Sequence, residues 1–233
     1  MKIGCFVVCY NEEKILPHFI KHYSMFCEDI YVLDNESTDR SVDIAKEFGC
    51  KIISWSNDTI NENKYVELKN NIYKEYRHLY DYIIVCDCDE FIYHENLIEY
   101  IKLTNYEVYK CIGYEMCCDD FSYGSSDIKN ITVGSRSDSF DKCVLFKSSI
   151  DINYSIGAHT CDNVFTESFI ELRHMKYINL ENVKIRYKEM SNRLSEINKK
   201  NGWGYHYSWS DIEIENYYNK IKNSCEYHNQ LNR

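Results

Sequence analysis

The sequence lacks any long hydrophobic run, and it contains one proline and eight glycines among its 233 residues. No segment approaches the roughly 20 apolar residues that cross a bilayer as a helix, so we expect no transmembrane segment. The chain also lacks internal repeats and low-complexity linkers, and its length suits one domain. We therefore expect residues 1–233 to form a single domain with a substantial core.

The chain has fewer basic than acidic residues. The chain has 27 Lys and Arg against 37 Asp and Glu, which gives a formal net charge of −10. Binding to nucleic-acid phosphates requires a cationic surface, so nucleic acid is excluded as a partner. An acidic protein can still bind a nucleotide when a metal ion supplies positive charge.

The paired C-x₂-C spacing of a structural zinc site is absent, although the chain has 12 cysteines. Several of them fall in apolar, strand-like runs, where a free thiol behaves as a small hydrophobe; these are Cys5, Cys9, Cys86 and Cys111. The first nine residues are too short an apolar stretch for a signal peptide and lack a cleavage site. We expect free thiols and a reducing, cytoplasmic location.

Strand and helix patterns alternate over the first 90 residues. Apolar, β-branched runs predict strands at 3–9, 30–33, 51–54 and 82–86. Helical patterns lie between them at 13–26, from 37–39 to about 48, and at 65–79. Pro17 suits a first helical turn, Ser37, Thr38 and Asp39 offer capping oxygens, and Gly49 suits a helix end. This order predicts an α/β fold with a mostly parallel central sheet flanked by helices.

The alternation is lost after residue 91. We expect a short helix over 96–103, a strand over 108–116, and an irregular polar loop over 119–141. Further on, the pattern predicts short strands at 143–146 and 169–172 and helices at 180–197 and 212–221. The second half is therefore expected to be irregular and to end in helices.

Asp87-Cys88-Asp89-Glu90 directly follows the strand-like run 82–86. Two carboxylates one residue apart thus lie at the carboxyl end of a core strand, where open α/β sheets bind ligands. Buried carboxylates are costly unless a cation neutralises them. Because Mg²⁺ and Mn²⁺ prefer carboxylate and phosphate oxygens, the spacing indicates a metal that grips a phosphorylated substrate.

Three segments close successive predicted strands: Val-Val-Cys-Tyr-Asn-Glu-Glu at 7–13, Tyr-Val-Leu-Asp-Asn-Glu-Ser-Thr-Asp at 31–39, and Cys-Asp-Cys-Asp-Glu-Phe at 86–91. In this order they resemble family 2 glycosyltransferases with the GT-A fold, closest to the branch related to family 92 enzymes. Leu-Arg-His-Met-Lys-Tyr at 172–177 is a weaker match to the Leu-x-His-Tyr motif of that branch. The resemblance implies a nucleotide-binding half over 1–95 and an acceptor-side half over 96–233.

The resemblance also implies which residues contact a nucleotide sugar lying across the strand ends. Tyr10 would stack on the base, and Asp34 would accept a hydrogen bond from a uracil-type N–H or from ribose. A plain turn is the alternative reading of Asp34 and its neighbour. Lys64 or Lys69 would touch the diphosphate, although a solvated helix face explains both. The full set expected to contact the nucleotide is Tyr10, Asn11, Glu12, Asp34, Asn35, Lys64 and Asp87.

The same resemblance implies a Mn²⁺ or Mg²⁺ ion that bridges both phosphates and stabilises the charge of the leaving group. Asp89 is expected to be its main ligand, and Asp87 to bind it directly or through water. A late histidine often adds a contact. His174 is the first choice because it lies in the matching motif, and His159 is the second.

An inverting transfer requires a general base that deprotonates the acceptor hydroxyl. In the family this is an acidic residue of the second half. The family motif around the base is not recognisable in this sequence. The first candidates are therefore Asp119 and Asp120, and the second candidates are Asp138 and Asp162. Inversion is thus implied by resemblance alone.

We therefore expect a metal-dependent glycosyltransferase that moves a sugar from a UDP-linked donor to a hydroxyl of a glycan, protein or lipid-linked acceptor, with oligomerisation left open. A haloacid-dehalogenase-type phosphohydrolase is an alternative, but that chemistry places its Asp-x-Asp on the first strand. A sugar nucleotidyltransferase would need a glycine-rich loop after that strand. A non-catalytic nucleotide-sugar-binding domain is the third alternative, and intact Asp87 and Asp89 argue against it.

Overall fold

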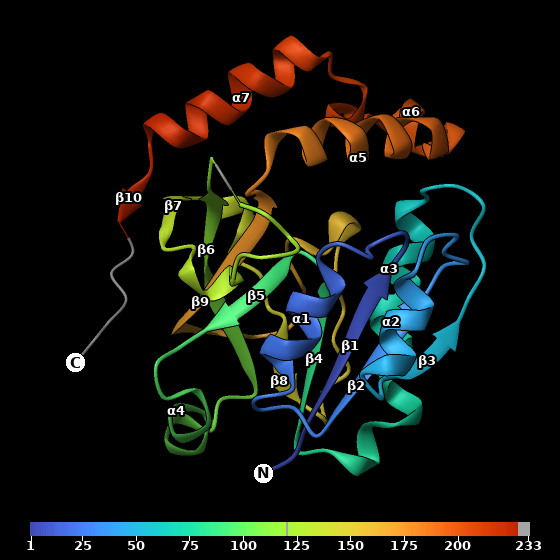
Figure 1. Ribbon diagram of the computed structural model, residues 1–233. Coiled ribbons are helices and arrows are strands. Elements are labelled where there is room, and N and C mark those ends of the chain that lie inside the picture. Colours follow the sequence, from blue (N-terminus) through green and yellow to red (C-terminus); the bar gives the residue numbers. More distant parts are fainter. Residues whose placement is uncertain (120, 228–233) are drawn as a thin grey trace.

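The structure is a computed structural model that describes residues 1–119 and 121–227. Over these residues a ten-stranded sheet is flanked and capped by helices (Figure 1). The main path of the sheet runs β10-β7-β6-β8-β4-β1-β2-β3, and β5 and β9 join it from one side. The predicted α/β fold is confirmed, with a sheet that is parallel in its first half and mixed in its second.

The first half of the sheet consists of four parallel strands: β4 (Tyr82–Asp87), β1 (Ile3–Cys9), β2 (Asp29–Asp34) and β3 (Lys51–Ser54). All seven residues of β1 are buried, as expected for a parallel strand that is covered on both faces. The register pairs Cys9 with Asp34 and Val8 with Asp87. The polar residues that follow these strands therefore meet at one edge of the sheet.

Helices α1 (Leu16–Tyr23), α2 (Ser41–Glu47) and α3 (Glu62–Asn71) connect these strands, close to the predicted positions. Pro17 lies in the first turn of α1, where its missing N–H costs no hydrogen bond. After α2, Gly49 adopts a φ of +74°, which glycine tolerates without a Cβ clash. Two short 3₁₀ turns, Ile72–Glu75 and Arg77–Leu79, replace the end of the helix predicted over 65–79.

The prediction that Ser37 and Thr38 cap α2 is wrong. Ser37 Oγ instead accepts a hydrogen bond from the backbone N–H of Asn11 (3.0 Å), and the backbone N–H of Thr38 donates to Asn11 Oδ1 (2.8 Å). Asp39 alone among the three reaches the helix, accepting from the N–H of Ser41 (2.8 Å). These polar side chains therefore tie the loop after β2 to the loop after β1.

The second half of the sheet contains β5 (Glu90–Tyr93), β6 (Val108–Cys117), β7 (Val133–Arg136), β8 (Leu145–Lys147), β9 (Thr166–Tyr177) and β10 (Glu226–Tyr227). The sequence did not predict β5, and β7 lies within the predicted irregular loop. β9 has 12 residues where four were expected. It pairs antiparallel with β5 and parallel with β6, so His174 is opposite Glu90 on one side and Glu115 on the other.

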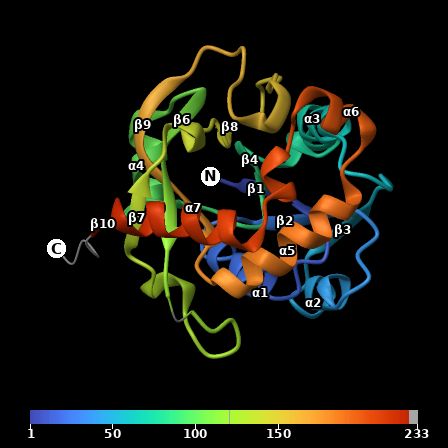
Figure 2. The same cartoon turned by 90° about the horizontal axis from the view of Figure 1, so that it is seen from above.

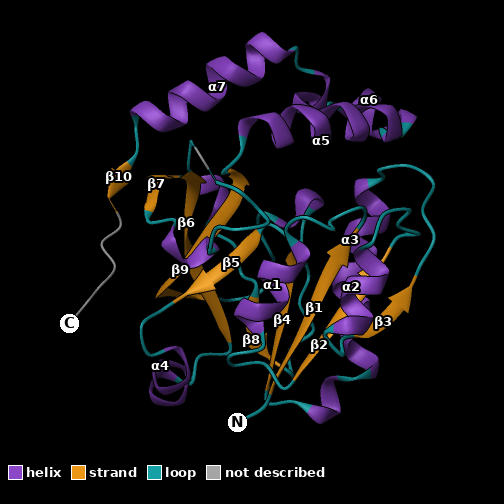
Figure 3. Ribbon diagram, in the orientation of Figure 1, coloured by secondary structure: helices purple, strands orange, loops and turns teal. Residues whose placement is uncertain are grey.

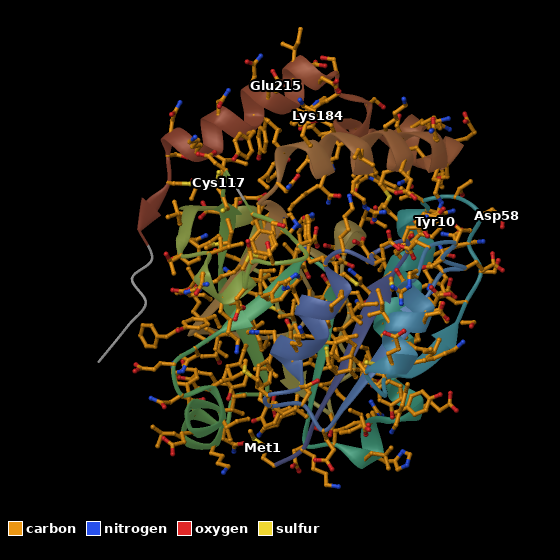
Figure 4. The ribbon with its side chains drawn as sticks, in the orientation of Figure 1. Met1, Tyr10, Asp58, Cys117, Lys184 and Glu215 are labelled. Atoms are coloured by element: carbon orange, nitrogen blue, oxygen red, sulfur yellow. The ribbon has the colours of Figure 1, made fainter. Side chains whose placement is uncertain are left out.

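Three helices form a layer over the edge of the sheet where β1 and β4 end (Figures 1 and 2). The predicted helix over 180–197 is broken at Leu194, where Ser195 begins a new helix by accepting from the N–H of Asn198. Lys184 and Glu215 join two of the helices through a 2.7 Å ion pair (Figure 4). The helices of the layer are α5 (Leu180–Arg193), α6 (Glu196–Asn201) and α7 (Asp211–Asn223).

The remaining helix, α4 (Leu97–Thr104), lies at the opposite end of the molecule from this layer (Figure 1). Within the described residues, no helix is both long and apolar enough to cross a membrane. All twelve cysteines are free thiols.

His22 of α1 is buried, and its Nε2 lies 2.8 Å from the carbonyl oxygen of Ile92. Burial lowers the pKa of His22 from 6.5 to about 4. Below pH 6.5 the unfolded chain binds a proton that the folded chain refuses, so this histidine should remove about 3 kcal/mol of unfolding free energy between pH 6.5 and 4. In urea denaturation, His22→Gln should lose about 3 kcal/mol less unfolding free energy over this pH interval than the wild type does. His78→Gln, which replaces an exposed histidine, is the control. If the free energy of unfolding of His22→Gln falls with pH as steeply as that of the wild type, the prediction is contradicted.

Candidate active site

A cavity of about 660 Å³ lies between the carboxyl ends of β1 and β4 and the underside of α5. Residues 10–12 and 87–90 line it from the sheet, and residues of α5 and of the turn Tyr205–Ser208 line it from above. In Figure 3 the loops that follow β1 and β3 reach toward the same helical layer. Figure 4 shows Tyr10 just below α5 and α6, far from Met1 at the other end of the strands. The cavity thus lies where open α/β sheets bind ligands.

Asp89 and His174 line this cavity and form a hydrogen-bonded row with buried Glu115. His174 Nε2 lies 3.1 Å from Asp89 Oδ2, and His174 Nδ1 lies 2.7 Å from Glu115 Oε2. The register of β9 with β6 produces the second contact, since it places His174 opposite Glu115. The ring of Phe140 stacks on the imidazole at a centroid distance of 4.0 Å. Strand pairing and stacking therefore fix the orientation of His174.

The charges of this row depend on one another. Burial alone would lower the pKa of His174, but the carboxylates of Glu115 and Asp89 outweigh it and raise the pKa to about 10. Burial acts to raise the pKa of Asp89, but the adjacent imidazole holds it well below its usual range. Asp89 is therefore ionised, and a proton holds it to His174.

Two buried ion pairs fix the other carboxylates of the motif. Asp87 Oδ1 lies 2.8 Å from Nζ of buried Lys69 on α3. Glu90 Oε1 lies 2.6 Å from Nζ of Lys142, and both of these side chains are buried. Glu90 Oε2 also accepts from the backbone N–H of Asp87 (3.1 Å). Lysines thus neutralise Asp87 and Glu90, and Asp89 is the carboxylate that faces His174.

Asp89 and His174 fit a divalent ion that takes the place of the proton on His174 Nε2, because only the neutral imidazole binds a metal. Their donor atoms are 3.1 Å apart, close to the roughly 3 Å that separates adjacent ligands of one Mg²⁺-sized ion. Glu115 on the other ring nitrogen is the outer partner that a metal-binding histidine usually has. The pair suits an ion completed by phosphates and water. Across residues 1–119 and 121–227, no group of three or more His, Cys, Asp or Glu side chains forms a protein cage for a metal.

Two predicted contacts of the nucleotide, Tyr10 and Glu12, line the cavity but already have partners from α5. The guanidinium of Arg193 lies 3.3 Å above the ring centroid of Tyr10. Arg186 Nη2 lies 2.6 Å from Glu12 Oε1. Burial raises the pKa of Glu12 to about 7 against the opposing charge of Arg186. A base that stacks on Tyr10 must therefore displace Arg193 or join its stack.

Asn11 also lines the cavity, whereas three other predicted contacts lie outside it. Asp34 is buried, and its carboxylate accepts from the backbone N–H of Ser37 (3.3 Å). Asn35 is buried against the backbone of residue 57. Lys64 is exposed on α3, and Lys69, one turn further on, is the lysine that lines the cavity.

The structure does not bring Asp119, a predicted general base, into the cavity. Its carboxylate accepts from Tyr218 (2.8 Å) and from Lys222 (2.5 Å), both on α7. Asp120 lies outside the described residues. Asp138 pairs with Arg136 on the surface, and Asp162 accepts from a side chain of the same loop. His159, the second choice as a metal ligand, lines the cavity but lies beyond Phe140 from His174.

Sequence reasoning missed Lys176, two residues after His174 on the same face of β9. Its Nζ lies 4.8 Å from the ring centroid of Tyr187, 5.0 Å from that of Tyr207, and 3.4 Å from His206 Nε2. No Asp or Glu in the described chain forms an ion pair with it. Burial opposes its charge, but both tyrosines raise its pKa above the usual value. The two-residue period of a strand was the signal that could have identified it.

Residues 5–145 match the family model described as glycosyl transferase family 2, so the chain belongs to this family. It is also similar to an uncharacterized glycosyltransferase of Rickettsia typhi, with 40% identity over 52 residues. That match covers 22% of this chain and 18% of the relative, so the chain spans less than a fifth of the curated relative it matches. The predicted family is confirmed. The closeness to the family 92 branch stays a prediction.

Among solved structures, the chain is similar to glucosyl-3-phosphoglycerate synthase from Mycobacterium tuberculosis in complex with Mn²⁺, UDP and glucosyl-3-phosphoglycerate. The identity is 16%, the TM-score is 0.34, and the match covers 48% of this chain and 44% of that one. The complex of the same enzyme with Mn²⁺ and UDP-glucose gives 16% identity and a TM-score of 0.34, over 48% and 43% of the two chains.

Proposed function

We propose that the protein is a metal-dependent glycosyltransferase that moves a sugar from a UDP-linked donor to a hydroxyl acceptor with inversion. The observation that carries this proposal is the row Asp89–His174–Glu115 at the carboxyl edge of the sheet of a family 2 chain. We propose a single catalytic domain, in which residues 1–95 bind the nucleotide and residues 96–233 face the acceptor.

Asp89 and His174 would hold the Mn²⁺ or Mg²⁺ ion. When bound, such an ion stabilises the negative charge of a leaving diphosphate. Glu115 keeps the imidazole oriented through its 2.7 Å contact with Nδ1. Asp87, neutralised by Lys69, is better placed to reach the ion or the ribose through water than to replace Asp89.

Lys176 and Lys69 supply the positive charge of the chain itself. Both side chains line the cavity, as do those of Lys14, Lys142 and Arg186. Lys69 is committed to Asp87, whereas Lys176 is surrounded by aromatic rings and has no carboxylate partner within the described residues. Asp89 and Glu115 act on the charge of Lys176 only from a distance, and a desolvated ammonium group without a direct ion pair favours an anionic ligand. We therefore assign Lys176 to the donor diphosphate.

Removing the charge of Lys176 should weaken UDP binding. A hydrogen bond to a charged group contributes about 1.5–3 kcal/mol, so Lys176→Met should raise the Kd for UDP at saturating Mn²⁺ by roughly 10- to 100-fold. Isothermal titration calorimetry measures this directly. Lys188→Met, an exposed lysine of α5, is the matched control. Equal Kd values for Lys176→Met and the wild type would remove Lys176 from the diphosphate site.

The nucleoside contacts also remain proposals. Tyr10 offers its ring to the base from the sheet side, with Arg193 above it. Asp34 would reach the base or ribose only if the turn at Ser37 opens, since its carboxylate now faces the backbone of that turn. The acceptor class, a hydroxyl of a glycan, protein or lipid-linked molecule, follows from the family resemblance.

A panel of nucleotide sugars incubated with and without Mn²⁺ tests the proposed function. We expect Mn²⁺-dependent release of a nucleoside diphosphate from one or more UDP-sugars, with water as the slow acceptor. Release of inorganic phosphate from phosphate monoesters would indicate the phosphohydrolase alternative instead. Tight binding of a UDP-sugar without turnover, even with added glycan acceptors, would indicate the non-catalytic binding domain.

A further inference from the structure

The backbone around His159 has an unusual shape. Gly157 and Ala158 both adopt left-handed conformations, with φ of +78° and +51°. A Cβ on Gly157 would lie 2.7 Å from Cδ2 of the His159 ring, so the glycine makes room for that ring. A left-handed alanine is uncommon, and backbone strain of this kind concentrates at functional sites. The strained turn presents the ring of His159 to the cavity.

The hydrogen bonds of His159 define its tautomer. Nδ1 lies 2.7 Å from the carbonyl oxygen of Ser139, which can only accept a hydrogen bond. Nδ1 therefore carries a proton, and the neutral ring has its lone pair on Nε2. The ring also packs edge-on against Phe140, with centroids 5.7 Å apart at 77°. The imidazole is thus held in place on one side while Nε2 makes no hydrogen bond or ion pair within residues 1–119 and 121–227.

Among the described residues, the other proton acceptors that line the cavity have partners, although Glu62 forms no ion pair and reaches only the backbone of Gly157. Both ring nitrogens of His174 contact carboxylates, and His206 Nε2 lies 3.4 Å from Nζ of Lys176. The carboxylates of the cavity that pair with Lys or Arg side chains are Glu12, Asp87, Glu90 and Glu189. His159 differs from these groups because its basic atom is free and faces the cavity.

We infer that His159 is the general base of the glycosyl transfer, taking the proton of the acceptor hydroxyl at Nε2. This inference rests on the proposed function. As the O–H bond breaks, the proton moves to Nε2 and the acceptor oxygen bonds to the anomeric carbon of the donor. The bond from that carbon to the diphosphate oxygen breaks, and its electron pair leaves with the diphosphate. His159 and His174 both pack against the ring of Phe140, His159 edge-on and His174 stacked.

Burial, together with the charge of Lys142, favours the neutral form of His159. Burial and then the ammonium group of Lys142 lower its pKa below 6.5, outweighing the Ser139 carbonyl and the carboxylates of Glu90 and Asp87. From α3, Glu62 reaches the backbone of the adjacent Gly157, and from the turn above the cavity His206 faces the same space. A neutral imidazole is the form that accepts a proton, so catalysis should fail as the pH falls and His159 protonates.

The test measures UDP release from the UDP-sugar that the wild type turns over in the presence of Mn²⁺, with water in place of the acceptor hydroxyl. His159→Ala should lower kcat by about 100-fold or more, in keeping with the usual contribution of a general base. The Kd for UDP with Mn²⁺ should stay within about twofold of the wild type. The acidic limb of the pH–rate profile should disappear in His159→Ala and in His159→Gln. Added imidazole should restore the rate of His159→Ala but not that of His159→Gln, and His78→Ala is the control for an exposed histidine.

Three outcomes would overturn the assignment. A wild-type rate and acidic limb in His159→Ala would show that another group is the base. Loss of that limb in Glu62→Gln but not in His159→Ala would assign the role to Glu62. Failure of the wild type to bind UDP with Mn²⁺ or to release UDP from any UDP-sugar would overturn the proposed function, and the assignment of His159 with it.

Discussion

Replacing Asp89 with Asn is expected to lower the Mn²⁺-dependent affinity for UDP by more than about 100-fold, since loss of even an outer partner of a metal ligand costs about 10- to 100-fold. The substitution keeps the size of the side chain but removes the charge that faces His174 Nε2 at 3.1 Å. Calorimetric titration of UDP at fixed Mn²⁺ gives the effect. UDP release from the donor should be lost in parallel.

Asp43→Asn is the matched control, because Asp43 is exposed on α2 and does not line the cavity. Thermal unfolding of both variants should show that Asp89→Asn still folds, since Glu115 continues to hold His174. A Kd for UDP that is the same with and without Mn²⁺ in the wild type would contradict the assignment of a metal to this carboxylate.

Replacing Glu115 with Gln should weaken Mn²⁺ binding by about 10- to 100-fold without changing UDP affinity in the absence of metal. Glu115 is buried and touches the ion site only through Nδ1 of His174. Its loss leaves the imidazole less firmly oriented and less basic as a ligand. Glu167→Gln, an exposed carboxylate of β9, is the control. Unchanged Mn²⁺ affinity in Glu115→Gln would mean that His174 does not bind the ion.

The parallel half of the fold was predictable because its strands are buried on both faces. Each reads as a continuous apolar run that ends in polar residues, as Tyr82 to Asp87 does. β5 escaped prediction because it has only four residues and directly follows the Asp-x-Asp segment. β9 escaped in part because it begins with two exposed polar residues, Thr166 and Glu167, that suggest a loop.

The positions of the candidate site residues were predictable wherever these residues follow strand ends closely in sequence. Asp87 and Asp89 needed only the preceding strand, and His174 needed a local motif. The partner of His174 was not predictable, because Glu115 is 59 residues away and meets it through a β6–β9 pairing that no local pattern specifies. Tertiary contacts also decided against Asp119, whose partners on α7 lie 99 and 103 residues further along.

The helical layer adds charged side chains of α5 to the site, which the sequence did not predict. Arg186 Nη1 donates to the backbone carbonyl of Asn11 (3.0 Å), and its Nη2 donates to that of Tyr10 (3.1 Å). Glu189 accepts from the side chain of Asn11 (2.6 Å). The polar face of α5 therefore holds the loop after β1 and closes the cavity from above.

The central claim is that Asp89 and His174 together hold the ion that grips the donor diphosphate. A crystal structure with UDP and Mn²⁺, with anomalous diffraction data that locate manganese, tests it most directly. The account predicts one manganese peak bound by Asp89 Oδ2, His174 Nε2 and oxygens of the diphosphate. A peak bound by Asp87 or by UDP alone, with His174 still paired to Asp89, would contradict it.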